Sequence, residues 1–116
     1  MSERVEKARD KMKLYFYILK GIGARYIELS ECEVMDYPKS YKPVSEFPDG
    51  VFRMLIMKSE IGHIIGNYYK TVVLTEKNNK LAKELFRNYY IRLIKEHQKE
   101  IDELNGKLKA VEELED

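Results

Sequence analysis

The feature that most constrains the fold of this chain is a stripe of apolar residues at helical spacing across residues 78–114. The stripe recurs in steps of three and four residues, which predicts one long amphipathic helix. Thr75, Asn78 or Asn79 can cap its start. A helix over these 37 residues would be about 55 Å long, at ~1.5 Å per residue, which is longer than a domain of this size requires.

Part of the stripe has the three-four spacing of a coiled-coil seam, over fewer than three heptads. The seam residues are Ile94, His97, Ile101, Leu104, Leu108 and Val111. A second copy would bury them, so the pattern predicts a homodimer, with folding back against a first helix as the alternative. Because His97 lies in the seam, we expect its protonation, at about pH 6.5, to weaken the assembly.

A second helical stripe covers the N-terminal residues 1–23. Its apolar members are three or four residues apart: Val5, Ala8, Met12, Tyr15, Leu19 and Ile22. Gly21 and Gly23 follow, and glycine often ends a helix because it adopts a positive φ without a steric penalty. The spacing predicts an N-terminal helix, with a short strand over residues 15–19 as the alternative.

The residues between these helices, 25–76, have the pattern of a small antiparallel sheet. Partial alternation over residues 25–36 predicts a strand with Ile27 and Leu29 facing the core. The apolar runs 51–57 and 68–74 predict an antiparallel pair of strands. The expected fold class is therefore α+β in a single domain over 1–116, with an N-terminal helix, about three strands and a long C-terminal helix.

The segment 37–50 contains all three prolines and ends in the turn pair Asp49-Gly50, so it predicts a loop or a sheet edge. It combines aromatic and cationic side chains on a constrained backbone, which is typical of contacts with a protein partner. The candidate partner-binding residues are Tyr37, Tyr41, Lys42 and Phe47. The alternative is that these rings only cover the sheet.

Three residue pairs within 59–74 support a second interpretation: Ile61-Gly62, Ile65-Gly66 and Thr71-Val72. At this spacing they resemble the helix-turn-helix of many DNA-binding proteins, which implies a dimeric transcriptional regulator. The nucleic-acid contacts would be Asn67, Tyr69 and Lys70, with Lys80, Lys83 and Arg87 on the following helix. The consecutive β-branched residues 71–73 favour strands instead.

Charge and side-chain chemistry exclude several classes of function. The basic segments 1–25 (seven basic, three acidic residues) and 76–95 (six and two) sit in a chain whose net charge is only +1, whereas phosphate-binding domains are usually clearly basic. The sequence contains no nucleotide-binding glycine motif, nucleophile elbow or metal-ligand set, so no enzymatic activity, cofactor or metal is expected. The longest apolar run, 14–19, is far below the roughly 20 residues of a membrane span. With a single cysteine, Cys32, the chain is expected to be cytoplasmic and free of membranes.

Several segments between residues 25 and 114 carry a broader resemblance. They are Pro38-Lys39-Ser40-Tyr41-Lys42, Lys58-Ser59-Glu60-Ile61-Gly62, the strand predicted at 69–74 and the Glu/Lys-rich terminal helix. Together they resemble small, mostly uncharacterised accessory proteins of phages and other mobile elements. The resemblance implies a stand-alone binding protein that occupies a host or defence protein, as anti-CRISPR proteins do, with no chemistry of its own.

Overall fold

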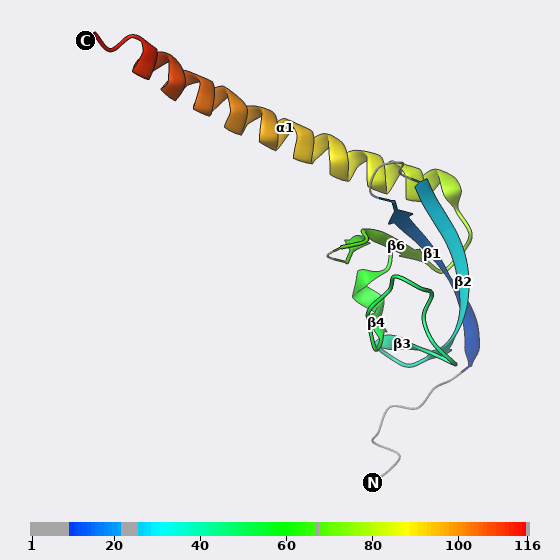
Figure 1. The fold of residues 1–116 in the computed structure, drawn as a ribbon. Coiled ribbons are helices and arrows are strands. Elements are labelled where there is room, and N and C mark those ends of the chain that lie inside the picture. The colour runs from blue at the N-terminus through cyan, green and yellow to red at the C-terminus, as the bar shows by residue number, and fades with distance from the viewer. Residues whose placement is uncertain (1–9, 22–25, 67, 116) are drawn as a thin grey trace. The chain divides into compact units, whose positions relative to one another are not determined.

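The computed structural model describes residues 10–21, 26–66 and 68–115. The chain divides into two units, the first ending at Leu85 and the second beginning at Phe86. The first unit holds a six-stranded antiparallel sheet, and helix α1 (Asn79–Glu112) begins in it and makes up most of the second (Figure 1). The expected fold class is therefore wrong. Among the described residues the only α-helix is the C-terminal α1, and the sheet has six strands instead of about three.

Strand β1 (Lys11–Lys20) occupies the place of the predicted N-terminal helix. Leu14, Phe16 and Ile18 alternate along it and are fully buried, which is the two-residue period of a strand. The helical stripe was misleading because apolar residues fill 14–19 continuously and satisfy both periods. Aromatic and β-branched side chains in this run pack well on a pleated sheet, so tertiary packing selects the strand. The rest of the predicted helix, residues 1–9 and 22–23, lies outside the described residues.

The central strands of the sheet are β2 (Tyr26–Asp36), β1 and β6 (Thr71–Leu74). Phe16 of β1 pairs with Ser30 of β2 on one side and with Val73 of β6 on the other. The strand predicted over 25–36 is confirmed by β2, but Ile27 is 45% exposed. Cys32 and Val34 face the core in its place, because Ile27 and Leu29 belong to the other alternating set.

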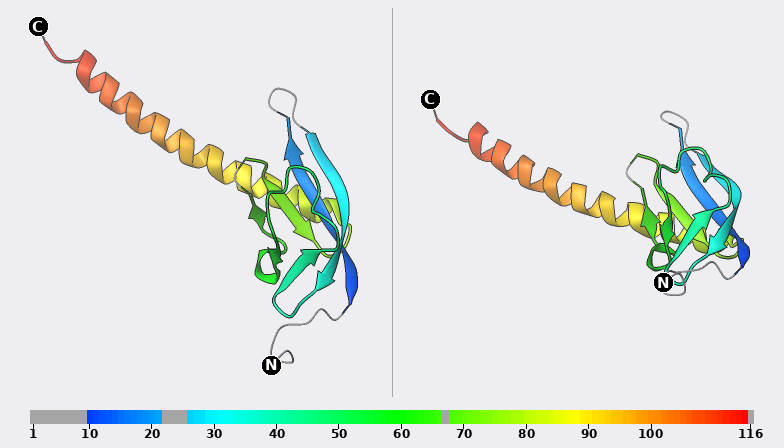
Figure 2. Two further views of the ribbon diagram at one scale, coloured as in Figure 1. Left: turned by 60° about the horizontal axis from the view of Figure 1, so that its bottom comes forward. Right: turned by 90° about the horizontal axis from the view of Figure 1, so that it is seen from below.

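Three short strands complete the sheet, and the strand order of the whole sheet is β4-β3-β2-β1-β6-β5. They are β3 (Ser40–Pro43), β4 (Ile56–Met57) and β5 (Ile64–Ile65). The sheet is strongly curled (Figure 2), and a connection that includes the 3-10 turn Lys58–Glu60 joins its two edge strands, β4 and β5. The predicted loop 37–50 therefore contains strand β3. Of the predicted strand 51–57, only the last two residues form a strand, β4.

One face of the sheet carries the main hydrophobic core. Its buried residues come from five strands and from a loop: Leu14, Phe16, Ile18, Cys32, Val34, Tyr41, Phe47, Ile56 and Val73. The ring of Phe47 lies 5.4 Å from that of Phe16, measured between centroids. The segment after β3 therefore folds over the sheet and closes this core.

The start of α1 is hydrogen-bonded, through Tyr17, to the face of the sheet opposite the main core. Tyr17, Val72, Leu74 and Ala82 are all buried. Asn78 caps the helix, since its Oδ1 accepts a hydrogen bond from the backbone N–H of Leu81 at 3.0 Å. This cap is one of those predicted from the sequence.

Candidate functional site

The structure separates the four residues predicted to contact a partner. Tyr41 and Phe47 are 7% and 9% exposed and belong to the core. Tyr37 is half-buried and Lys42 is exposed, with the Lys42 ammonium 5.1 Å from the centre of the Tyr37 ring. Only this cation–π pair remains at the surface, because the other two rings fill the space beneath the loop.

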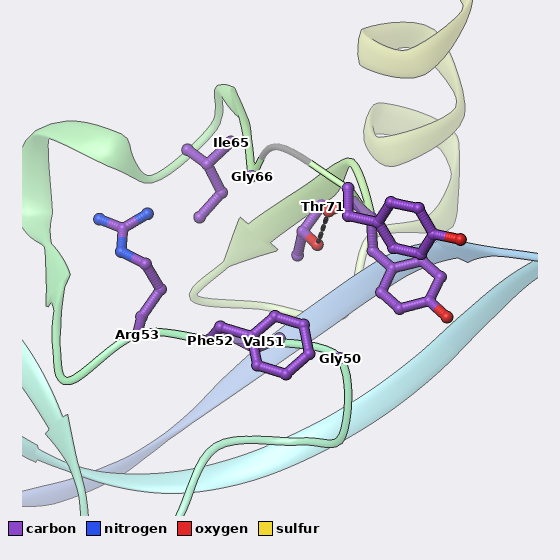
Figure 3. Close-up of a pocket in the computed structure, with 9 residues that line it drawn as sticks. Gly50, Val51, Phe52, Arg53, Ile65, Gly66 and Thr71 are labelled. Carbon is purple, nitrogen blue, oxygen red and sulfur yellow. Dashed lines mark hydrogen bonds between the residues drawn. The ribbon is translucent and has the colours of Figure 1, made fainter.

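A cavity of about 390 Å³ lies between two loops of the first unit (Figure 3). It is lined by Gly50, Val51, Phe52, Arg53, Ile65, Gly66, Tyr68, Tyr69 and Thr71. Phe52 is 80% exposed and Tyr68 is 69% exposed. We call these two rings and the cavity between their loops the Phe52–Tyr68 surface.

Two glycines shape the loops of this surface. Gly50 has a φ of 95° and Gly66 a φ of 94°, a region that residues with a Cβ rarely adopt. A Cβ on Gly50 would lie 3.2 Å from Cδ2 of Tyr69, and one on Gly66 would lie 2.4 Å from the Tyr69 carbonyl oxygen. Both loops therefore pack closely against Tyr69, and each places an exposed ring two residues after its glycine.

An ion pair holds the loop that carries Phe52. Arg53 Nη2 lies 2.5 Å and 2.6 Å from the two carboxylate oxygens of Glu60, which also accepts the backbone N–H of Met57 at 2.9 Å. Burial alone would raise the pKa of Glu60, but the Arg53 and Met57 hydrogen bonds outweigh it, so the pKa lies below its ordinary value. Glu60 therefore stays ionised at neutral pH and fixes the loop to the 3-10 turn.

A second cavity, of about 460 Å³, adjoins the same loop. It shares Gly50, Val51, Phe52 and Arg53 with the first and adds Met54, which is almost fully exposed. The loop 50–54 thus carries two of the most exposed large apolar side chains of the sheet unit, between two hollows. Large apolar side chains in such positions are typical of interaction surfaces.

Sequence reasoning missed Phe52, Met54 and Tyr68, because the runs 51–57 and 68–74 were predicted to be strands. The available signal was the glycine two residues before each exposed ring, at Gly50 and Gly66. Glycine in such a run often marks a turn or a bend instead of a strand interior.

Among the described residues, those assigned to DNA contact have no helix-turn-helix around them. In the described parts of 59–74 the chain forms the end of a 3-10 turn and strands β5 and β6. Tyr69 is half-buried, and Lys70 Nζ donates to the Gly66 carbonyl at 2.9 Å. Asn67 lies outside the described residues. Lys80, Lys83 and Arg87 are exposed on α1, which is ordinary for a helix surface.

The seam residues on α1 are exposed. The apolar members are 48–66% exposed, namely Ile94, Ile101, Leu104, Leu108 and Val111, and His97 is exposed among them. We call these six residues the α1 stripe. Within residues 86–115 nothing covers it.

The side chains that could support chemistry are dispersed. Among the described residues, no three histidine, cysteine or acidic side chains come together as a possible metal site. Cys32 is a free, buried thiol within 3.5 Å of the Glu46 carbonyl oxygen, and burial raises its pKa. A raised pKa leaves less thiolate, which is the opposite of what a cysteine nucleophile requires.

Comparison with known proteins gives no relative: no family model, curated protein or solved structure matches the chain. In the part of the chain that the structure describes, no helix is both long enough and apolar enough to span a membrane.

Proposed function

We propose that this protein is a non-enzymatic binding protein that contacts a partner protein through the Phe52–Tyr68 surface. The observation that carries the proposal is the exposure of two aromatic rings, Phe52 and Tyr68, on separate loops that border one cavity. Burying such a ring against a partner is favourable by about 1.5–3 kcal/mol. Tyrosine is also among the residue types that dominate binding energy at protein interfaces.

Close contacts hold the described parts of both loops in place, which supports binding. Gly50 and Gly66 pack against Tyr69, and Arg53 is held by Glu60. A surface that is fixed before binding loses less conformational entropy when the partner docks. The cavity beside the rings accepts an apolar side chain of the partner, since most of its lining is apolar or aromatic.

The proposed partner is a host enzyme or a defence complex, which is the class implied by the resemblance to phage and mobile-element accessory proteins. The proposal includes self-association of two copies through the α1 stripe, because a helix in water does not ordinarily leave such a seam uncovered. It also includes a cytoplasmic location, which the free thiol of Cys32 supports.

The test compares capture of partner proteins from a lysate of the source cells by the wild type and by Phe52→Ser/Tyr68→Ser. We expect the double variant to lose a specific partner that the wild type retains, with an unchanged melting temperature. Tyr26→Ser is the matched control, because Tyr26 is also an exposed aromatic residue of the sheet unit but lies outside this cavity. Equal capture by all three proteins would contradict the proposed surface.

A further inference from the structure

The α1 stripe has the register of a heptad seam, so the arrangement of a second copy can be worked out. This inference rests on the proposed self-association. Taking Ile94 as position a, Ile101 and Leu108 are also a residues, whereas His97, Leu104 and Val111 are d residues. All six lie in the regular helix α1 and are exposed.

Charged and polar residues flank the stripe and decide how a second copy can lie. On one side, at the g positions, are Glu100 and Lys107, which directly precede Ile101 and Leu108. On the other side, at the e positions, are Gln98, Asn105 and Glu112. In an antiparallel pair the g side of one helix faces the g side of the other, whereas in a parallel pair g faces e. Interhelical charge pairs at these positions set partner orientation.

We propose that two copies pair antiparallel, with Ile101 of each copy packed against Leu104 of the other. Glu100 of each copy then lies beside Lys107 of the other, which gives two identical pairs of opposite charge near the middle of the seam. The remaining layers set Ile94 against Val111 and Leu108 against His97. Each imidazole therefore contacts a leucine, and the two His97 residues stay apart.

The same charges select this register over its neighbours. Moving one helix by a heptad in one direction places Glu100 opposite Glu100 of the second copy. Moving it in the other direction places Lys107 opposite Lys107. Like charges at these positions destabilise helix pairing, so only the central register pairs opposite charges on this side.

A parallel pair would form weaker charge pairs along the seam and would bring the two His97 side chains together. Glu100 would face the uncharged Asn105, and Lys107 would face Glu112, the last residue of α1, where helices fray. The two His97 side chains would also meet at one d layer, where protonation would set two positive charges against each other. The antiparallel arrangement avoids both features.

The experiment is sedimentation equilibrium of the full chain at low ionic strength with charge-swapped variants. We expect Glu100→Lys and Lys107→Glu each to raise the dimer dissociation constant roughly tenfold, because each makes both pairs repulsive. The double variant Glu100→Lys/Lys107→Glu restores opposite charges and should return to within about twofold of the wild type. Lys99→Glu changes the charge equally on the outer face of the helix and should have no effect.

Each alternative gives a different result. In a parallel dimer Glu100→Lys would have little effect, Lys107→Glu would weaken the dimer, and the double variant would stay as weak as Lys107→Glu. A wild-type chain that remains monomeric would overturn self-association itself, and with it that part of the proposed function. A dimer that is insensitive to all four variants would overturn only the antiparallel arrangement.

Discussion

The hydroxyl of Tyr17 donates a hydrogen bond to Oδ1 of Asn79 at 2.8 Å, which ties the inner strand β1 to the first turn of α1. The hydroxyl oxygen of Tyr17 also accepts a hydrogen bond from the backbone N–H of Asn78 at 2.9 Å. Tyr17 is 4% exposed, so neither partner is replaced easily by water. One phenol therefore joins the sheet to the start of the helix.

Removing this hydroxyl should destabilise the protein. We expect Tyr17→Phe to lower the free energy of unfolding by about 1–2 kcal/mol, because it leaves the N–H of Asn78 without its partner. Urea denaturation measures the change. Tyr26→Phe removes the same atom from an exposed ring and should change stability by less than about 0.5 kcal/mol. Equal losses in the two variants would show that the hydrogen bonds contribute nothing specific.

The Arg53–Glu60 ion pair predicts a pH-dependent contribution to stability. Because the pKa of Glu60 is lowered in the folded protein, its contribution is fully present above the ordinary glutamate pKa of about 4.3. It is lost as the pH falls through the lowered folded-state value. We expect Glu60→Gln to reduce stability by about 1 kcal/mol at neutral pH, and the difference from the wild type to disappear in strong acid.

Thermal melts of both proteins across the acid range measure this difference. Glu31→Gln is the control, because Glu31 pairs with Lys13 on the exposed sheet surface and such pairs contribute little. A difference between Glu60→Gln and the wild type that stays constant with pH would contradict an ionised Glu60 as its source.

Phe47 and Phe52 are five residues apart but should respond in opposite ways to truncation. Phe47→Ala removes a ring from the core and should destabilise the protein by about 3–5 kcal/mol. Phe52→Ala removes an exposed ring and should leave stability within about 0.5 kcal/mol while weakening partner binding. Chemical denaturation of the two variants distinguishes them, and similar stabilities would show that Phe47 does not close the core.

The parts of the fold that could be predicted from sequence are those whose pattern has one meaning. The stripe across α1 and the asparagine cap at its start each fit one structure, and the β-branched run in β6 favours a strand over the helix-turn-helix alternative. Residues 11–20 do not, because apolar side chains occupy positions at both helical and strand spacing. There the choice depends on pairing with β2, the next strand along the chain, and with β6, which is distant in sequence.

The candidate surface was harder to predict than the fold. Tyr41 and Phe47 looked available because they lie among prolines, yet β3 and the loop after it turn both rings inward. Phe52 looked buried because it lies in an apolar run, yet the strand begins only at Ile56. Composition sets how many apolar residues a segment has, but the path of the backbone decides which of them reach solvent.

The glycines give a final prediction, because a Cβ added at Gly66 would lie too close to the backbone of Tyr69. Gly66→Ala would place a Cβ 2.4 Å from the Tyr69 carbonyl oxygen in addition to the strain of a positive φ. Gly62 has a similar φ of 81° with open space around it, so Gly62→Ala should show the conformational term alone, about 1 kcal/mol. We expect Gly66→Ala to lose about 2 kcal/mol or more in urea denaturation and also to weaken partner binding, because the loop that carries Tyr68 must shift. If Gly66→Ala and Gly62→Ala were equally stable, the close approach of Gly66 to Tyr69 would not constrain the Phe52–Tyr68 surface.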